Sequence, residues 1–417
     1  MANTYLTPTM ITRESLMVLH QKLNFTGSIN RQYDDRFARD GAKIGTSLNI
    51  RMPAKYTTRT GAAASTQDHV ERSTPLTVTN QIGVDVSWSS VDLTMSMDDF
   101  RDRHIEPAMA QLAATIESNN LTAAYKLVNN YTGTTSTQLT YKQFQQNGAA
   151  ITNELGPTSQ RSAWLTPDSV VEFNDATKGL FQSAENIKKQ YREGMMGRTG
   201  GFDVYENTLV PSHTRGTLAG TPLTNGAALG LSTTANSWAS TTDIQVDGAT
   251  SGTTLKAGDI ITLSGVYDVH PESKATRGSL KKFAVQADVT LTTAATAYTV
   301  TVKPALIYGS GNAYQNCALS GVSDTDGLTV TAFGVAGTTY GQNLFAHKDA
   351  FVFATADLID VSTMGAWGAR ENYEGISMRL AKQWSASTDA VTTRFDILYG
   401  FAGLYPELAS RNFYALS

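Results

Sequence analysis

The sequence predicts an α+β protein in which a small all-β barrel domain is inserted into a mixed domain. A chain of 417 residues exceeds what one hydrophobic core usually serves, so two or more domains are expected. A helical repeat occupies residues 107–129, and short alternating strands follow one another quickly from residue 255. Mixed helix and strand patterns stand on both sides of these strands, so we interpret them as an insertion.

The first 40 residues predict an N-terminal arm. A short amphipathic helix is expected to begin near Thr12, with Glu14 in its first turn. The residues that it would bury are Leu16, either Met17 or Leu19, and Leu23. The polar stretch after it, INRQYDDRFARDGAKIG, has no hydrophobic periodicity, and we expect it to be extended.

Residues 41–95 predict an extended β-hairpin loop. Apolar residues alternate at 46–52 and again at 76–88, which indicates two strands. The connection between them, bounded by Pro53 and Pro75, is polar and far longer than the two to five residues of a tight hairpin turn. We therefore expect it to project and to dock on a neighbouring subunit. Its charged residues are the candidate inter-subunit contacts: Lys55, Arg59, Asp68, Glu71 and Arg72.

A long helix is expected within residues 96–132. Pro107 is tolerated only in a first turn, so the helix should begin near Glu106. Three residues at helical spacing, Met109, Leu112 and Ile116, are predicted to form its buried seam. The residues expected to continue the seam are Ala123, Leu127 and Val128.

The mixed region spans residues 133–216. A strand is expected to end at Pro167 and to be followed by a helix capped by Asp168 or Ser169. A second helix is predicted at 181–197, and a strand at 201–211.

The predicted insertion covers residues 217–338. Its first part, 217–252, holds two charged residues and is rich in Gly, Ala, Ser and Thr, as in a linker or a strand-poor entry to the domain. Strands are expected at 258–266, at 283–291 as one alternating run, at 298–304 and at 328–335.

Composition and motifs argue against several classes of function. Charged residues make up only 17% of the chain, and Thr, Ser and Gly take their place, as is common in β-rich proteins. The net charge of −4 gives no basic field for nucleic acid, and a single cysteine excludes a thiolate zinc site. No apolar run is long enough for a membrane span, and the first residues do not resemble a secretory signal.

No catalytic, cofactor-binding or metal-binding constellation is predicted. The run REGMMGRTGGFD lacks the Gly-Lys-Ser/Thr ending of a phosphate loop and precedes a strand. The six histidines are scattered singly, and His104 and Glu106 do not share a helical face. We therefore expect no enzyme and no cofactor.

The order of these elements resembles the major capsid (coat) proteins of tailed bacteriophages, and more closely the short-tailed-phage subgroup with an inserted β-barrel domain and a Hong Kong 97-type fold. The segments that carry the resemblance are GTSLNIRMPAKY, MDDFRDRHIEPAMAQLA, GFDVYENTLVP, LKAGDIITLSGV and AYTVTVKPALI. An extracellular β-rich adhesin or carbohydrate-binding module is the alternative interpretation, favoured by the Thr- and Ser-rich half of the chain.

The resemblance implies a domain plan and a set of partners. The implied parts are an arm (1–40), an extended loop hairpin (41–95), a spine helix of the peripheral domain (96–132), a first half of the apical domain (133–216), the inserted barrel (217–338), and the second apical half with a C-terminal peripheral strand (339–417). It further implies hexamers and pentamers in an icosahedral shell, a scaffolding protein during assembly, a portal protein at one vertex, DNA enclosed without sequence-specific binding, and assembly in the host cytoplasm.

Overall fold

The computed structural model describes most of the chain, which divides into two compact units. The described residues are 8–32, 47–64, 66–89, 105–134, 138–177, 198–232, 236–292, 296–361, 367–373, 376–387 and 389–415. Unit 1 comprises Met1–Ile50, Pro75–Leu121 and Phe351–Leu404, and unit 2 comprises Arg51–Thr74, Thr122–Ala350 and Tyr405–Ser417. The helix predicted at 181–197 and most of the polar arm, 33–45, lie outside the described residues.

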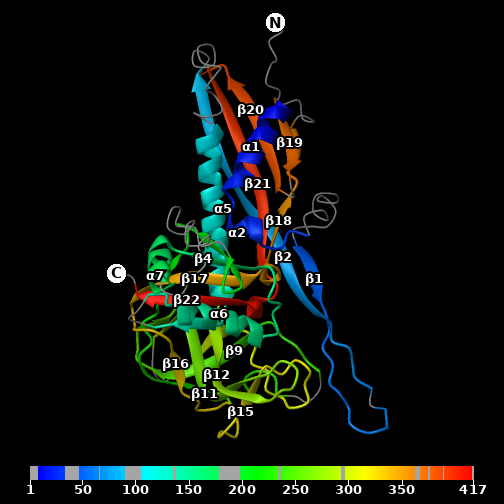
Figure 1. Ribbon diagram of the computed structural model, residues 1–417, viewed down its shortest axis with the longest axis vertical. Coiled ribbons are helices and arrows are strands. Elements are labelled where there is room, and N and C mark those ends of the chain that lie inside the picture. The colour runs from blue at the N-terminus through cyan, green and yellow to red at the C-terminus, as the bar shows by residue number, and fades with distance from the viewer. Residues whose placement is uncertain are drawn as a thin grey trace. The chain divides into compact units, whose positions relative to one another are not determined.

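Unit 1 contains one six-stranded sheet. Its strands in spatial order are β1 (Ser47–Met52), β2 (Arg72–Ser89), β21 (Ala390–Gly403), β20 (Ile376–Ser385) and β19 (Trp367–Tyr373), with β18 (Phe351–Ala356) paired to β21 (Figure 1). Antiparallel pairing of β2 with β21 runs from Val78 opposite Gly400 to Ser89 opposite Ala390. The two strands predicted around the polar loop are therefore present, although β2 begins earlier than expected.

Three helices contribute to unit 1. They are α1 (Pro8–Lys22), α2 (Phe25–Ser28) and the larger part of α5 (Glu106–Leu127). Helix α1 contacts β19 and β20, and Leu16, Leu19 and Leu23 are buried, as predicted. The described helix starts at Pro8, before the expected Thr12, because proline is well suited to a first helical turn.

Unit 2 contains a mixed seven-stranded sheet. Its spatial order is β3 (Tyr131–Gly133), β22 (Ala409–Ala415), β17 (Thr339–His347), β4 (Arg161–Leu165), β6 (Phe202–Glu206) and β5 (Arg198–Thr199), with β7 (Ser212–Thr214) paired to β17. The short 3-10 turn η2 (Lys348–Ala350) follows β17, and the turn η4 (Pro406–Leu408) precedes β22. Residues far apart in sequence thus share one sheet, because β17 and β22 pair antiparallel beside β4.

Two helices accompany this sheet, α6 (Tyr141–Asn153) and α7 (Pro167–Thr177). Four phenylalanines, Phe144, Phe173, Phe202 and Phe345, form the aromatic core between them, with Phe144 ring centroids 4.7–5.5 Å from the other three. The predicted cap of α7 is wrong: Thr166 caps the helix, and its Oγ1 accepts the Ser169 amide at 3.4 Å. Pro167 occupies the first turn, so the cap must precede it.

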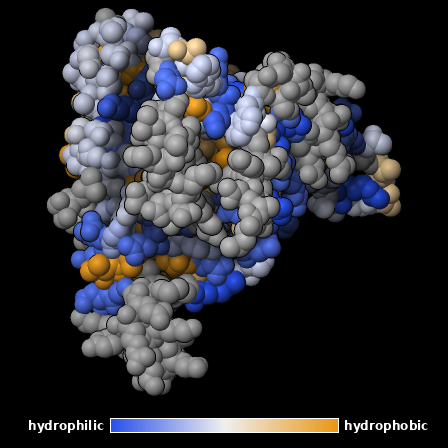
Figure 2. Space-filling model, turned by 90° about the horizontal axis from the view of Figure 1, so that it is seen from above, coloured by the Kyte–Doolittle hydropathy of each residue, from blue (hydrophilic) through white to orange (hydrophobic). Residues whose placement is uncertain are grey.

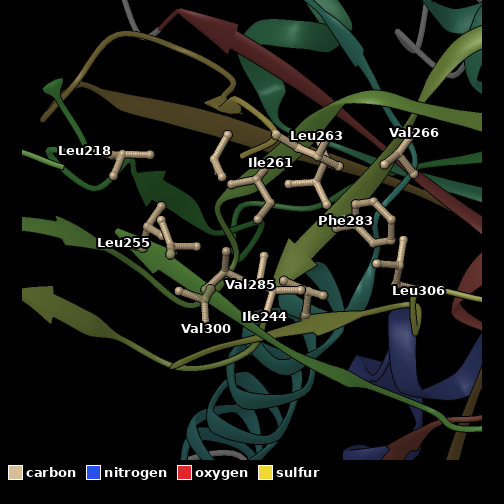
Figure 3. Close-up of a cluster of buried hydrophobic side chains, with 14 of the residues drawn as sticks. Leu218, Ile244, Leu255, Ile261, Leu263, Val266, Phe283, Val285, Val300 and Leu306 are labelled. Atoms are coloured by element: carbon tan, nitrogen blue, oxygen red, sulfur yellow. The ribbon is translucent and has the colours of Figure 1, made fainter. Parts of the chain in front are cut away.

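A second seven-stranded sheet of unit 2 lies between β7 and β17 in the sequence. Its spatial order is β15 (Cys317–Leu319), β11 (Ile260–Val269), β12 (Thr276–Val285), β14 (Tyr298–Lys303), β9 (Thr242–Ala249) and β8 (Gly220–Thr224), with β16 (Val330–Ala332) paired to β11. Strands β10 (Thr253–Leu255) and β13 (Val289–Leu291) form a separate pair. Side chains from this seven-stranded sheet, from the β10–β13 pair and from adjoining loops pack in one apolar cluster, which includes Ile244, Ile261, Phe283 and Val300 (Figure 3).

Two predictions for this region are wrong. Residues 217–252 are not a linker, because they supply β8 and β9, and Ile244 and Val246 of β9 are fully buried. These two apolar residues alternate over only a few positions among small polar residues, so the sequence pattern did not indicate a strand. The run 283–291 is not one strand either: β12 ends at Val285, and the exposed Asp288 accepts the Ala257 amide at 2.7 Å before β13 begins at Val289.

The long helix is α5, Glu106–Leu127, and the predicted seam residues Met109, Leu112 and Ile116 are at most 1% exposed. The expected continuation is partly wrong. Leu121, Ala124 and Val128 are buried, whereas Ala123 and Leu127 are half-buried, because the stripe drifts around the helix at 3.6 residues per turn.

Leu112→Ala should therefore lower the free energy of unfolding of the soluble subunit by about 2–5 kcal/mol, the range for a fully buried leucine. Denaturant unfolding followed by circular dichroism measures the change. Gln111→Ala, one residue away on the exposed side of the same helix, is the matched control and should unfold as wild type does. Equal stabilities of the two variants would show that this side of α5 is not a structural seam.

Candidate assembly surfaces

The titratable residues do not form a reactive centre in the described part of the chain. Among those residues, no group of three or more His, Cys, Asp and Glu side chains is placed to hold a metal ion. None of the described helices combines the length and the hydrophobicity needed to cross a membrane. The larger polar clusters described below are buried joints between elements within one unit.

The first joint contains Tyr125, His213 and Asp259. His213 Nε2 donates to Asp259 Oδ1 at 2.8 Å, and His213 Nδ1 lies 3.3 Å from the Tyr125 hydroxyl. All three side chains are at most 5% exposed. The row of hydroxyl, imidazole and carboxylate has the composition of a catalytic triad, but its burial leaves no room for a substrate, so its role is structural.

The joint is completed by the turn at residues 256–259, which belongs to the segment LKAGDIITLSGV. Asp259 also accepts the amides of Gly216 (3.0 Å) and Lys256 (2.8 Å). Gly258 has a φ of +103°, and a Cβ there would lie 2.9 Å from the Tyr125 ring, so only glycine fits without a shift. The turn therefore fastens the start of β11 to the mixed sheet.

Arg411 of β22 binds the same turn beside the ring of Tyr125. Its guanidinium donates to the Gly258 carbonyl at 2.6 Å and lies 4.9 Å from the Phe413 ring centroid. Burial lowers the pKa of Arg411 to about 10, which still leaves the side chain charged near neutral pH. A buried cation of this kind is tolerated because carbonyls and aromatic faces surround it.

A second joint connects β11 and β12 to the end of α6. Lys281 Nζ lies 2.7 Å from Asp268 and 3.7 Å from Glu154, and Arg277 Nη1 lies 2.9 Å from Asp268. Burial acts to lower the pKa of Lys281, but the carboxylates of Glu154 and Asp268 raise it overall. Removing both acids would leave the buried Lys281 ammonium uncompensated, which costs more than the ion pairs themselves contribute.

The polar loop is fixed at its base by Tyr314. The Tyr314 hydroxyl donates to the Val70 carbonyl (2.9 Å) and accepts the Lys55 amide (3.1 Å), so it holds both legs of the loop. The Arg72 guanidinium stacks over the Tyr314 ring at 5.4 Å and donates to the Pro53 carbonyl at 3.1 Å. The base is therefore anchored within its own unit.

Between the base and the tip of the loop, the two legs are joined by fewer and more exposed contacts. The Thr57 amide donates to Gln67 Oε1 at 2.9 Å, and Tyr56 stacks on His69 with 6.3 Å between ring centroids. Figure 1 shows the two legs as an open, extended excursion of the chain. Residues 53–70 carry no strand among those described.

The structure divides the five candidate contact residues. Lys55, Arg59, Asp68 and Glu71 are exposed, and Arg59 donates to the Gly61 carbonyl at the tip. Arg72 is only 8% exposed, so its side chain stabilises the loop base of its own subunit and is not presented to a neighbour. The surface shown in Figure 2 is largely hydrophilic where it is coloured, with hydrophobic residues in small groups. Contacts through such a surface combine polar and apolar groups.

Glu117 of α5 is a buried carboxylate that sequence reasoning missed. It is 2% exposed and accepts the amides of Phe25 (3.0 Å) and Thr26 (3.1 Å), the first residues of α2. Asn120, one turn further along α5, donates to the Thr26 hydroxyl at 3.1 Å. An acid and an amide on the apolar stripe of a helix are the signal that would have indicated a partner at this place.

These features define the class of protein. Its polar clusters serve as internal joints, and a loop anchored at its base presents exposed charges, as expected of a structural protein that meets other subunits.

The family follows from comparison with known proteins. The family model described as "P22 coat protein - gene protein 5" matches residues 29–414. The chain belongs to the P22 coat protein family: it is a structural, non-enzymatic major capsid protein that forms the icosahedral shell of a tailed bacteriophage. The adhesin interpretation is therefore wrong. A search of curated proteins finds no match.

Solved phage structures resemble the chain at low identity. One titled "Mycobacterium phage Che8" is 10% identical with a TM-score of 0.46, and covers 94% of this chain and 90% of its own. "Capsid of Ralstonia phage GP4" is 8% identical with a TM-score of 0.43, and covers 94% and 88%. "CUS-3 coat protein I-domain" is 20% identical with a TM-score of 0.20, and covers 27% of this chain and 96% of its own. Family membership rests on the family-model match alone.

Glu117 generates a prediction for pH dependence. Burial raises its pKa to about 7 although backbone amides favour the charged form. Because the folded pKa lies above the unfolded one, the stabilisation is complete below about pH 4.5 and is lost as the pH rises through 7, at a rate of at most about 1.4 kcal/mol per pH unit. Glu117→Gln should remove this decline, so the variant gains stability relative to wild type between pH 5 and 8.

Denaturant unfolding of the soluble subunit across that pH range measures the effect. Glu172→Gln, on the exposed side of α7, is the control and should follow the wild-type profile. Parallel profiles for wild type and Glu117→Gln would show that the carboxylate does not titrate in this window.

Proposed function

We propose that this coat protein builds its shell as hexamers and pentamers on a Hong Kong 97-type fold, with residues 53–71 docked on a neighbouring subunit and α5 as the spine helix. The observation that carries the proposal is the loop itself. Tyr314 and Arg72 hold its base, while the charges at and near its tip have few partners among the described residues of this chain. Ordering such a loop costs conformational entropy, which contacts with a second copy would offset.

The partners follow from the same proposal. A scaffolding protein would guide assembly in the host cytoplasm, and a portal protein would occupy one vertex. DNA would be enclosed without sequence-specific binding, which is consistent with a net charge of −4.

Exchanging two loop charges tests the docking. Arg59→Glu combined with Asp68→Lys leaves the net charge unchanged and alters only exposed side chains. Each exposed ion pair contributes only about 0.2–1 kcal/mol, so the soluble subunit should fold as wild type does. The shell repeats each contact many times, so shell yield by electron microscopy should fall, and the loss should depend on salt.

Arg72→Met is the contrasting variant, because it removes an anchor within the subunit and should lower the stability of the soluble protein. If the charge exchange assembles as well as wild type at every salt concentration, the loop charges are not part of an interface. If wild type itself forms no shells, hexamers or pentamers, the assembly proposal fails.

The region between β7 and β17 is the second part of the proposal. We infer that residues 217–338 are the inserted domain of this coat protein, because seventeen buried hydrophobic residues of these strands and loops share one cluster. Both joints connect this region to the rest of unit 2 through residues inside the segment: Gly258, Asp259 and Lys281.

Residues 217–338 expressed alone should give a cooperative β-type thermal transition. Phe283→Ala in the same fragment should lower its stability by about 3–5 kcal/mol, which would tie the transition to the native core. A random-coil spectrum without a transition would contradict an autonomous domain.

A further inference from the structure

Two exposed tryptophans, Trp367 and Trp384, lie on neighbouring strands of the sheet of unit 1. Trp367 of β19 is 40% exposed and Trp384 of β20 is 57% exposed. Trp367 pairs directly with Lys382, two residues before Trp384, so the three side chains lie on one face of the sheet. The Lys382 ammonium lies 4.6 Å from the Trp367 ring centroid, over its face.

This face is the one that packs against the N-terminal helix. Successive residues of β20 point alternately to this face and to the opposite one. On this face lie Ile376, Met378 and Leu380, which are at most 1% exposed, and β20 contacts α1. The alternation continues through Lys382 to Trp384, where the burial stops. The described residues of the same subunit therefore leave the outer end of this apolar face exposed.

The patch carries both signs of charge beside its two indoles. The Trp384 indole N–H donates to Asp389 Oδ1 at 3.4 Å, which places a carboxylate beside Trp384, whereas the Lys382 ammonium lies over Trp367. A surface with a cation, two aromatic faces and an anion is complementary to a copy of itself, since the lysine of each copy can face the carboxylate of the other.

The size of the patch limits what it can do alone. A tryptophan side chain buries at most about 250 Å², so these exposed fractions leave roughly 200 Å² of aromatic surface. A stable pair of proteins needs about 800 Å² on each partner. The patch is too small to hold a dimer in solution, but it suits one contact among many in a shell.

We propose that the Trp367–Lys382–Trp384 patch is buried against the same patch of a second copy of this chain in the assembled shell. The proposal rests on the shell-forming function of the protein. Closed symmetric assemblies bring identical surfaces together at their two-fold axes, and a self-complementary patch fits a contact at such an axis.

Tryptophan quenching distinguishes the two states of the patch. Acrylamide quenching is compared between soluble subunit and shells, for wild type and for the Trp367→Phe/Trp384→Phe variant. In the soluble subunit the substitution should remove a strongly quenched component. The fluorescence of these two tryptophans is the difference between wild type and the variant. In shells, acrylamide should quench this fluorescence several-fold less, because the contact covers the indoles.

A pair of charge variants tests the partner. In Lys382→Glu the new carboxylate of one copy would face the Asp389 carboxylate of the other copy. Their repulsion should lower shell yield, and more so at low salt. Gln383→Glu is the matched control, because Gln383 is the next residue of β20, is exposed and points to the opposite face. Circular dichroism should show both soluble variants folded as wild type.

The outcomes separate this inference from the shell proposal. If wild type forms shells in which both tryptophans stay as quenchable as in the soluble subunit, the patch faces solvent and the inference is overturned. It is equally overturned if Gln383→Glu lowers the yield as much as Lys382→Glu, since the effect would then not belong to this face. Failure of wild type to form any shell is a failure of the assembly proposal instead.

Discussion

The carboxylate of Asp259 is the interaction on which the arrangement of unit 2 depends. It accepts the imidazole N–H of His213 and the backbone amides of Gly216 and Lys256, and is 1% exposed. These donors belong to the turn that carries Asp259 itself and to segments before the second sheet, so one acid fixes where that sheet begins. Losing the acid would leave several buried donors unpaired, each of which costs about 1–3 kcal/mol.

The other contacts at this joint follow from the same constraint. Because Asp259 holds the turn in place, Gly258 comes close to the Tyr125 ring, and its carbonyl faces the guanidinium of Arg411. The C-terminal strand β22 thus becomes part of the joint although Arg411 is 153 positions from Gly258. A coat protein must keep its shape while neighbours bind it, and buried hydrogen bonds such as these give that rigidity.

The loop at 53–71 shows the opposite design. Its base is held by one hydroxyl and one guanidinium, but its tip carries exposed charges. Rigidity at the base sets the direction of the loop, and exposure at the tip leaves groups for a partner. In unit 1, Glu117 holds α2 as Asp259 holds the turn, but amides are its partners and burial raises its pKa. We therefore expect this contact between Glu117 and α2 to respond to pH.

The sequence by itself determined the elements whose residues repeat locally. Helix α5 with Met109, Leu112 and Ile116 in its seam, the polar loop between Pro53 and Pro75, and the alternating strands β11 and β14 could all be predicted, because periodicity and proline act over a few residues. Tertiary structure alone decided the rest. Strand β9 is a strand because β14 and β8 pair with it, not because of its small polar composition. Arg72 is an anchor rather than a contact because Tyr314 lies beneath it, and the Tyr314 hydroxyl meets the Lys55 amide across 259 positions. Glu117 and Asp259 find their partners 92 and 46 positions away, and no local pattern specifies a hydrogen bond over such a separation.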